Sequence, residues 1–160
     1  FKMLKGVISV VSGYAGGNME NPTYSEVSSG MTGHAEVIRI DYDPDTISLN
    51  HLLTVFFATH DPTTKDRQGN DMGTQYRSII LYSNEGQKEV SKKFIKQLNG
   101  SNAKGSPIMT EIKKINKFWP AESYHKNYYE NNRSQKYCQV VINPKLEKVK
   151  KDFMKLLKSL

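Results

Sequence analysis

The sequence has few cysteines and tryptophans and no long apolar run. It contains one cysteine and one tryptophan in 160 residues. A single cysteine excludes an internal disulfide framework and any zinc site built from several thiolates. No apolar run approaches the roughly 18 residues that cross a membrane, and residues 1–5 do not form a signal peptide. We therefore expect a cytoplasmic protein without a membrane partner.

Length and composition suit a single compact unit. At 18.2 kDa the chain can bury one substantial core but is short for two domains of ordinary size. Hydrophobic residues make up 37% of the chain, and no repeat or linker divides it. We expect one domain over residues 1–160 that functions as a monomer.

The net charge of +7 comes from 23 Lys and Arg against 16 Asp and Glu. Such an excess raises the question of a nucleic-acid partner. The lysines, however, are concentrated in residues 88–104 and 145–158, where they alternate with apolar residues as on the solvated face of a helix. No aromatic and basic module for base stacking accompanies them, so we expect no nucleic-acid partner.

Apolar periodicity predicts interleaved strands and helices. Two long polar loops, 15–33 and 59–75, separate them, with a short helical turn at 22–28 capped by Thr23 or Asn21. The pattern predicts the α+β class, as a single-domain two-layer α/β sandwich with a ferredoxin-like mixed sheet and long irregular loops. The strands are expected at 5–14, 35–42, 77–82 and 109–115, the helices at 48–58, 84–98, 120–131 and 145–157, and a short apolar stretch at 137–142.

Polar side chains suited to a substrate occur in four places: Tyr24, Glu36, residues 71–76 and residues 122–128. Together they supply a carboxylic acid, several phenols and an aspartate, without a second thiol or a phosphate-binding glycine motif. Such a set suits the protonation and hydrogen bonding of a neutral polar oxygen, as reduction of a sulfoxide requires.

Six segments with polar, aromatic and glycine residues occur in order along the chain: Gly13–Gly17, Asn21–Val27, Thr32–Val37, His60–Thr64, Arg67–Ser78 and Phe118–His125. They resemble the signature segments of the A-type peptide methionine sulfoxide reductases. The resemblance implies reduction of the S epimer of methionine sulfoxide, free or in peptides, in protein repair and oxidative stress defence. It also implies a sulfenic acid intermediate, recycling by thioredoxin, and no metal or organic cofactor.

By this resemblance Glu36 is the acid that protonates the sulfoxide oxygen, and Tyr24 and Tyr76 hold the same oxygen. The alternative for Glu36 is an ordinary exposed strand carboxylate, and the alternative for both tyrosines is a core position with the hydroxyl bonded to backbone. An acid that works near neutral pH needs a pKa raised by burial. We therefore expect Glu36 in a partly apolar cleft.

The resemblance also places Asp71, His125 and Tyr128 at the substrate. Asp71 would organise the pocket, although it could equally cap the turn that follows it. The spacing of His34, His60 and His125 matches no metal-ligand motif. We expect these histidines to make structural hydrogen bonds to the loops rather than to bind a metal.

In the family, the nucleophilic cysteine lies in a Gly-Cys-Phe-Trp segment that precedes the equivalent of residues 1–4. The sequence does not contain this segment, so we expect an N-terminally incomplete domain. The alternative is a non-catalytic module that binds oxidised methionine. Cys138 lies where the family often places a resolving cysteine, but it could also be a buried cysteine on an apolar strand, and both interpretations remain open.

Overall fold

The computed structural model describes residues 1–159, and its architecture is built around a long central strand. This strand, β1 (Val7–Ala15), pairs antiparallel with β2 (Ala35–Tyr42) on one side and with β7 (Phe118–Pro120) on the other. The β-branched residues of β1 favour the extended backbone. The register of β1 and β2 places Tyr14 opposite Glu36.

The remaining strands form two smaller sheets. A short antiparallel hairpin joins β3 (Arg67–Gln68) to β4 (Asp71–Met72), and β5 (Ile79–Tyr82) pairs parallel with β6 (Glu111–Lys114). Parallel and antiparallel pairing therefore both occur, and helices and strands are interleaved along the chain. The predicted α+β class is confirmed.

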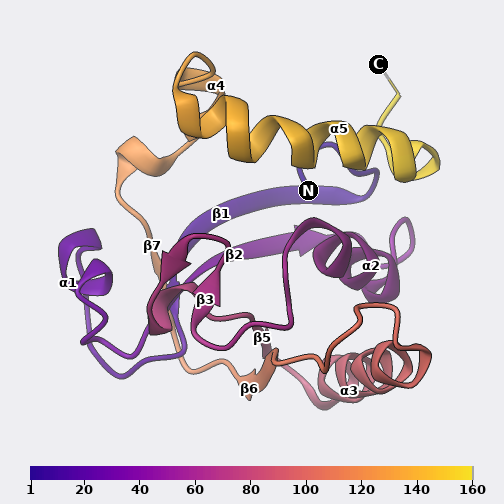
Figure 1. Ribbon diagram of the computed structural model, residues 1–160, viewed down its shortest axis with the longest axis horizontal. Coiled ribbons are helices and arrows are strands. Elements are labelled where there is room, and N and C mark those ends of the chain that lie inside the picture. The colour runs from indigo at the N-terminus through magenta and orange to yellow at the C-terminus, as the bar shows by residue number, and fades with distance from the viewer. Residues whose placement is uncertain (160) are drawn as a thin grey trace.

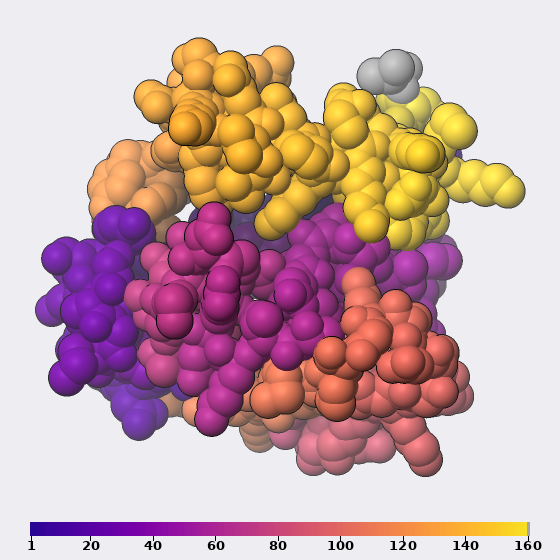
Figure 2. Space-filling model, in the orientation of Figure 1, coloured from indigo at the N-terminus to yellow at the C-terminus, as the bar shows by residue number. Residues whose placement is uncertain are grey.

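Three longer helices surround the strands. Figure 1 shows α5 along β1 at one side of the molecule and α3 at the opposite side, and α2 contacts both of these helices. The space-filling view in Figure 2 shows the C-terminal segment as a continuous layer over the rest of the chain. None of the helices within residues 1–159 is long and apolar enough to cross a bilayer. The helices are α1 (Tyr24–Ser28), α2 (Leu49–Thr59), α3 (Glu85–Ser101), α4 (Tyr128–Asn131) and α5 (Asn143–Asp152).

Side chains that the sequence marks as helix caps begin α1, α2 and α3. The Ser48 hydroxyl accepts from the His51 amide at 3.3 Å, and the Asn84 side chain accepts from the Gln87 amide at 2.9 Å. Each satisfies a first-turn N–H that has no partner within the helix. The predicted starts of α2 and α3 are therefore confirmed to within a residue, whereas α1 begins two residues after its predicted start at residue 22.

The core lies between the start of β1, α2 and α5. Burial of each large apolar side chain of this core contributes about 1.5–3 kcal/mol to the free energy of folding. The two ends of the chain are joined beside this core, where Lys5 N donates to Leu156 O and Lys158 N donates to Met3 O, both at 2.8 Å. The buried members of the cluster are Leu4, Val7, Ile47, Leu52, Val55 and Val149.

The predicted helix at 120–131 is wrong. The segment starts as the end of β7, forms a 3-10 turn at Ser123–His125 and becomes helical only in α4. Pro120 pairs with Gly13 of β1 as an edge-strand residue, and Asn127 has a left-handed backbone with φ of 52°. The strand pairing and the left-handed residue interrupt the helical pattern that the sequence indicates.

The interpretation that placed Cys138 on a strand is also wrong in its secondary structure. Cys138–Ile142 forms a π-helical turn that continues directly into α5. A short apolar run does not distinguish a buried strand from a buried helical segment. The helix itself ends at Asp152, before the predicted residue 157, and a 3-10 turn at Met154–Leu156 follows.

Candidate active site

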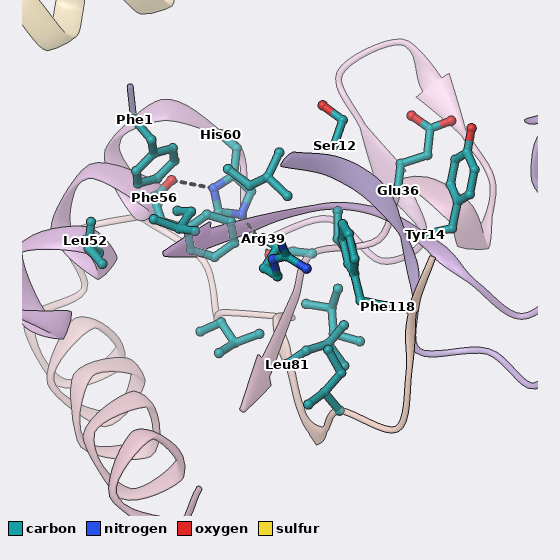
Figure 3. A pocket seen from close by; sticks show the side chains of 18 of the residues that line it. Phe1, Ser12, Tyr14, Glu36, Arg39, Leu52, Phe56, His60, Leu81 and Phe118 are labelled. Atoms are coloured by element: carbon teal, nitrogen blue, oxygen red, sulfur yellow. Dashed lines mark hydrogen bonds between the residues drawn. The ribbon is translucent and has the colours of Figure 1, made fainter. Parts of the chain in front are cut away.

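A cavity of about 1170 Å³ lies between β1, β2, α2 and β5. Figure 3 shows its two contrasting ends. Phe1, Leu52 and Phe56 line an apolar end near His60, whereas Glu36 and Tyr14 lie together at the other end. The second end is polar and is the candidate site.

Six of the seven predicted site residues line this cavity. They come from six different segments, which the loops between strands and helices bring together. Glu36, Tyr24 and Tyr76 therefore share one cavity, as their predicted roles require; the roles themselves stay predictions. The six are Tyr24, Glu36, Asp71, Tyr76, His125 and Tyr128, and the exception is Cys138.

Glu36 is the second residue of β2; it lines the cavity, although the residue as a whole is exposed to solvent. Burial raises the pKa of the Glu36 carboxyl, and the negative charge of Asp71 raises it further. Both effects disfavour the ionised form. The predicted direction of the pKa shift is confirmed, and Glu36 keeps its proton to a higher pH than an ordinary glutamate.

Tyr76 ends the 3-10 turn Thr74–Tyr76. Burial raises the pKa of its phenol, and Glu36 and then Tyr24 and Asp71 add to the increase. The phenol therefore remains a proton donor. Arg77 fixes this turn against the start of β2, because its guanidinium donates to Thr74 O at 2.8 Å and to Gly33 O at 3.0 Å. Sequence reasoning assigned no such role to Arg77.

Tyr24 is the first residue of α1, which begins with a capping box. The Thr23 hydroxyl accepts from Glu26 N at 3.3 Å, and the Glu26 carboxylate accepts from Thr23 N at 2.8 Å. The predicted Thr23 cap is confirmed. The ring of Tyr24 lies 4.8 Å from the ring of His125, measured between centroids.

His125 has an unused hydrogen-bonding group in the site. Its Nε2 atom is buried and has no hydrogen-bond partner among the described residues. A buried polar atom without a partner is costly unless a ligand or water satisfies it. His125 is therefore available to a bound polar group, which agrees with its predicted place at the substrate.

Two tyrosines at the site were missed by sequence reasoning. Tyr14 is buried opposite Glu36, and burial together with a hydrogen bond to Glu122 raises its pKa. Tyr137 lines the cavity, and its pKa is raised first by burial and then by the charges of Asp71 and Glu36. Tyr14 lies within a signature segment and Tyr137 precedes the cysteine, but only the fold shows that their rings reach the site.

Cys138 is completely buried, with 0% of its surface exposed. It begins the π-helical turn immediately after Tyr137, whose ring lines the cavity. The thiol therefore lies one residue from the cavity wall without reaching it. Any thiol exchange at Cys138 requires this turn to open.

His34 and His60 make the predicted structural hydrogen bonds, whereas Nε2 of His125 makes none with the described residues. His34 accepts from Gly17 N at 3.1 Å and donates through Nε2 to Met19 O at 2.7 Å. His60 donates through Nδ1 to Phe56 O at 2.6 Å, and its Nε2 lies 2.7 Å from the hydroxyl of Ser78. Because a carbonyl only accepts, these contacts assign the tautomer of each neutral ring.

Comparison with known proteins gives a consistent result. The family model described as peptide methionine sulfoxide reductase matches residues 1–157. The chain is 50% identical over 159 residues to the peptide methionine sulfoxide reductase MsrA of Chromobacterium violaceum, covering 99% of this chain and 90% of that protein. It is 53% identical over 148 residues to MsrA of Nautilia profundicola, covering 92% and 84% respectively.

The fold is also similar to solved structures. Mxr1 from Saccharomyces cerevisiae in reduced form superimposes with a TM-score of 0.77 and 34% identity, covering 83% of this chain and 76% of that chain. Mxr1 has also been crystallised in complex with Trx2.

Proposed function

This chain belongs to the peptide methionine sulfoxide reductase family, and from that premise we propose that it reduces methionine S-sulfoxide, free or in peptides, to methionine. The observation that carries the proposal is the convergence of Glu36, whose pKa is raised, with the phenols of Tyr24 and Tyr76 in one cavity. A protonated carboxyl and neutral phenols are suited to a sulfoxide oxygen, which accepts hydrogen bonds.

In the first step Glu36 protonates the sulfoxide oxygen while Tyr24 and Tyr76 donate hydrogen bonds to it. These interactions withdraw electrons from sulfur and favour attack by the thiolate of the family's nucleophilic cysteine, which lies in the Gly-Cys-Phe-Trp segment that residues 1–160 do not contain. The oxygen passes to the attacking sulfur, so that methionine leaves and the thiolate becomes a sulfenic acid. Asp71, His125 and Tyr128 line the same cavity and hold the rest of the substrate.

Cys138 then acts as the resolving cysteine. Its thiol condenses with the sulfenic acid to form a disulfide and water, and a dithiol reductant reduces the disulfide. We propose thioredoxin as this reductant, acting in the cytoplasm; the complex of Mxr1 with Trx2 supports the choice. The burial of Cys138 means that the Cys138–Ile142 turn opens during this step.

The decisive experiment is Glu36→Gln in the full-length protein. We expect methionine formation from a blocked methionine S-sulfoxide to fall by roughly 10²–10⁴-fold, because the amide cannot donate the proton. Glu20→Gln, at an exposed carboxylate in the loop before α1, is the matched control. Unchanged turnover in Glu36→Gln would remove the assigned acid. A wild-type protein that binds the peptide without ever forming methionine would overturn the function in favour of a binding module.

A further inference from the structure

Glu122 joins three segments that surround the polar end of the cavity. Its Oε1 accepts from Tyr14 Oη at 3.0 Å, and its Oε2 accepts from Tyr24 N at 3.1 Å and from Tyr124 Oη at 2.6 Å. Tyr14 belongs to β1 and Tyr24 to α1, whereas Tyr124 belongs to the 3-10 turn that follows β7. One carboxylate therefore connects a strand and a helix near the start of the chain to a 3-10 turn about a hundred residues later.

The bond to Tyr24 satisfies a donor that α1 cannot satisfy by itself. The first N–H groups of a helix have no intrahelical acceptor, and the Thr23 hydroxyl serves the amide of Glu26. Glu122 supplies the acceptor for Tyr24 N from outside the helix. Because α1 is only five residues long and Val27 is its one buried residue, this bond is a major restraint on the position of Tyr24.

The three donors also keep the Glu122 side chain ionised. Burial alone would raise its pKa, but the hydrogen bonds from Tyr124, the Tyr24 amide and Tyr14 outweigh this effect and lower the pKa. Bonds to an ionised acceptor are the stronger ones. A glutamine in this place would present one oxygen to three donors, and the backbone N–H of Tyr24 cannot reverse its role as a hydroxyl can.

Glu122 bonds the hydroxyl of Tyr14 and the backbone amide of Tyr24, and both tyrosines line the cavity. Tyr14 lies opposite Glu36, and the ring of Tyr24 packs against the ring of His125. His125 lies in the same turn as Glu122, because His125 N donates to Glu122 O at 3.0 Å. Glu122 itself does not line the cavity. Its influence on a substrate must therefore pass through the residues that it holds.

We propose that Glu122 is a positioning residue, whose carboxylate fixes Tyr24 at the polar end of the cavity so that the phenol meets the sulfoxide oxygen beside Glu36. The inference rests on the proposed function for its effect on turnover. The geometric part, that Glu122 restrains the first turn of α1, can be tested without any turnover.

The first test is amide hydrogen exchange in wild type and Glu122→Gln. We expect faster exchange at Tyr24 in the variant, because its N–H loses a charged acceptor, while α3 keeps its wild-type protection. Glu20→Gln is the control for loss of one negative charge in this region. Unchanged exchange at Tyr24 would overturn the proposal whether or not the protein reduces methionine sulfoxide.

The second test is a double-mutant cycle with Glu122→Gln and Tyr24→Phe in the full-length protein. We expect Glu122→Gln alone to lower kcat/KM by roughly tenfold, the loss expected for one weakened hydrogen bond. In the Tyr24→Phe background the same change should have little further effect, since the phenol that Glu122 positions is absent. A purely structural role would instead lower activity by the same factor in both backgrounds, and that result would overturn the proposal.

The design separates failure of this inference from failure of the proposed function. A wild-type protein without reductase activity would contradict the proposed function. The hydrogen-exchange measurement would still show whether Glu122 restrains α1. If Glu122→Gln does not fold, Tyr124→Phe replaces it, because it removes only one hydroxyl donor to Glu122 from an exposed side chain. Its smaller effect should also disappear in the Tyr24→Phe background, and an additive effect would contradict the proposal.

Discussion

Tyr14 and Glu36 lie directly opposite each other on neighbouring strands β1 and β2. Opposed residues of an antiparallel pair project to the same face of the sheet, and Figure 3 shows the two side chains together at the end of the cavity. The acid of the proposed reaction is thus carried by regular strand backbone rather than by a loop. Strand backbone holds a functional group more rigidly than a loop does.

The Asp71→Asn substitution should shift the pH dependence of the reaction. The charge of Asp71 is one cause of the raised pKa of Glu36, so its removal lowers that pKa, while burial continues to raise it. Glu36 then loses its proton at a lower pH. We expect the alkaline limb of the kcat/KM profile to move to lower pH in the variant. A uniform loss at every pH, with the limb in its wild-type position, would instead assign Asp71 to substrate binding alone.

The Cys138→Ser substitution separates the resolving and structural interpretations. In the full-length protein with its nucleophilic cysteine, we expect the variant to complete a first turnover and to remain active with a small dithiol. It should lose recycling by thioredoxin, because Cys138 is the one thiol among the described residues that could form a disulfide with the sulfenic acid. Steady-state assays with each reductant measure this difference. Full recycling by thioredoxin in the variant would show that the buried thiol serves packing only.

The His60→Gln substitution should reduce the acid sensitivity of the fold. Burial is the largest cause of the lowered pKa of His60, opposed by its bond to Phe56 O and assisted by Lys145 and Lys104. A histidine with a lowered pKa contributes stability above its ordinary pKa of about 6.5, and this stability is lost as the pH falls through the folded-state value. We therefore expect the free energy of unfolding of wild type to decrease below about pH 6.5 more steeply than that of the variant.

Urea unfolding at a series of pH values measures the His60 effect. His51→Gln, at an exposed histidine of α2, is the matched control. Equal slopes for wild type and His60→Gln would show that His60 does not contribute to the acid sensitivity.

The Gly17→Ala substitution should destabilise the loop that carries Tyr24. A Cβ at Gly17 would overlap the backbone of Gly33 and His34, which cannot move away as a flexible side chain could. We expect a loss of about 1–3 kcal/mol in the free energy of unfolding. Gly100→Ala is the control, since its Cβ meets nothing within 4 Å near the end of α3. The Gly100→Ala change should stabilise the protein by about 0.5–1 kcal/mol. Equal changes in the free energy of unfolding for the two substitutions would contradict the close contact of Gly17 with the backbone of Gly33 and His34.

The elements that sequence reasoning predicted well are those whose information is local. The start of α2 follows from Ser48 and the helical spacing of apolar residues behind it, and β1 follows from its β-branched residues. The segment at 120–131 was assigned wrongly because β7, which ends at Pro120, is specified by pairing with β1, far away in the chain. Pro120 permits both the start of a helix and the end of an edge strand, and only the partner strand decides between them.

The sequence by itself determined which chemical groups are available to the proposed reaction: an acid at Glu36, the phenols of Tyr24 and Tyr76, and a single thiol at Cys138. Only the tertiary structure decided that Tyr14 faces Glu36, that Glu122 links three segments and that Cys138 is enclosed. The reason is physical. The chemistry of a side chain belongs to the residue, whereas strand register, burial and the pKa of a carboxyl depend on groups that distant parts of the chain bring beside it.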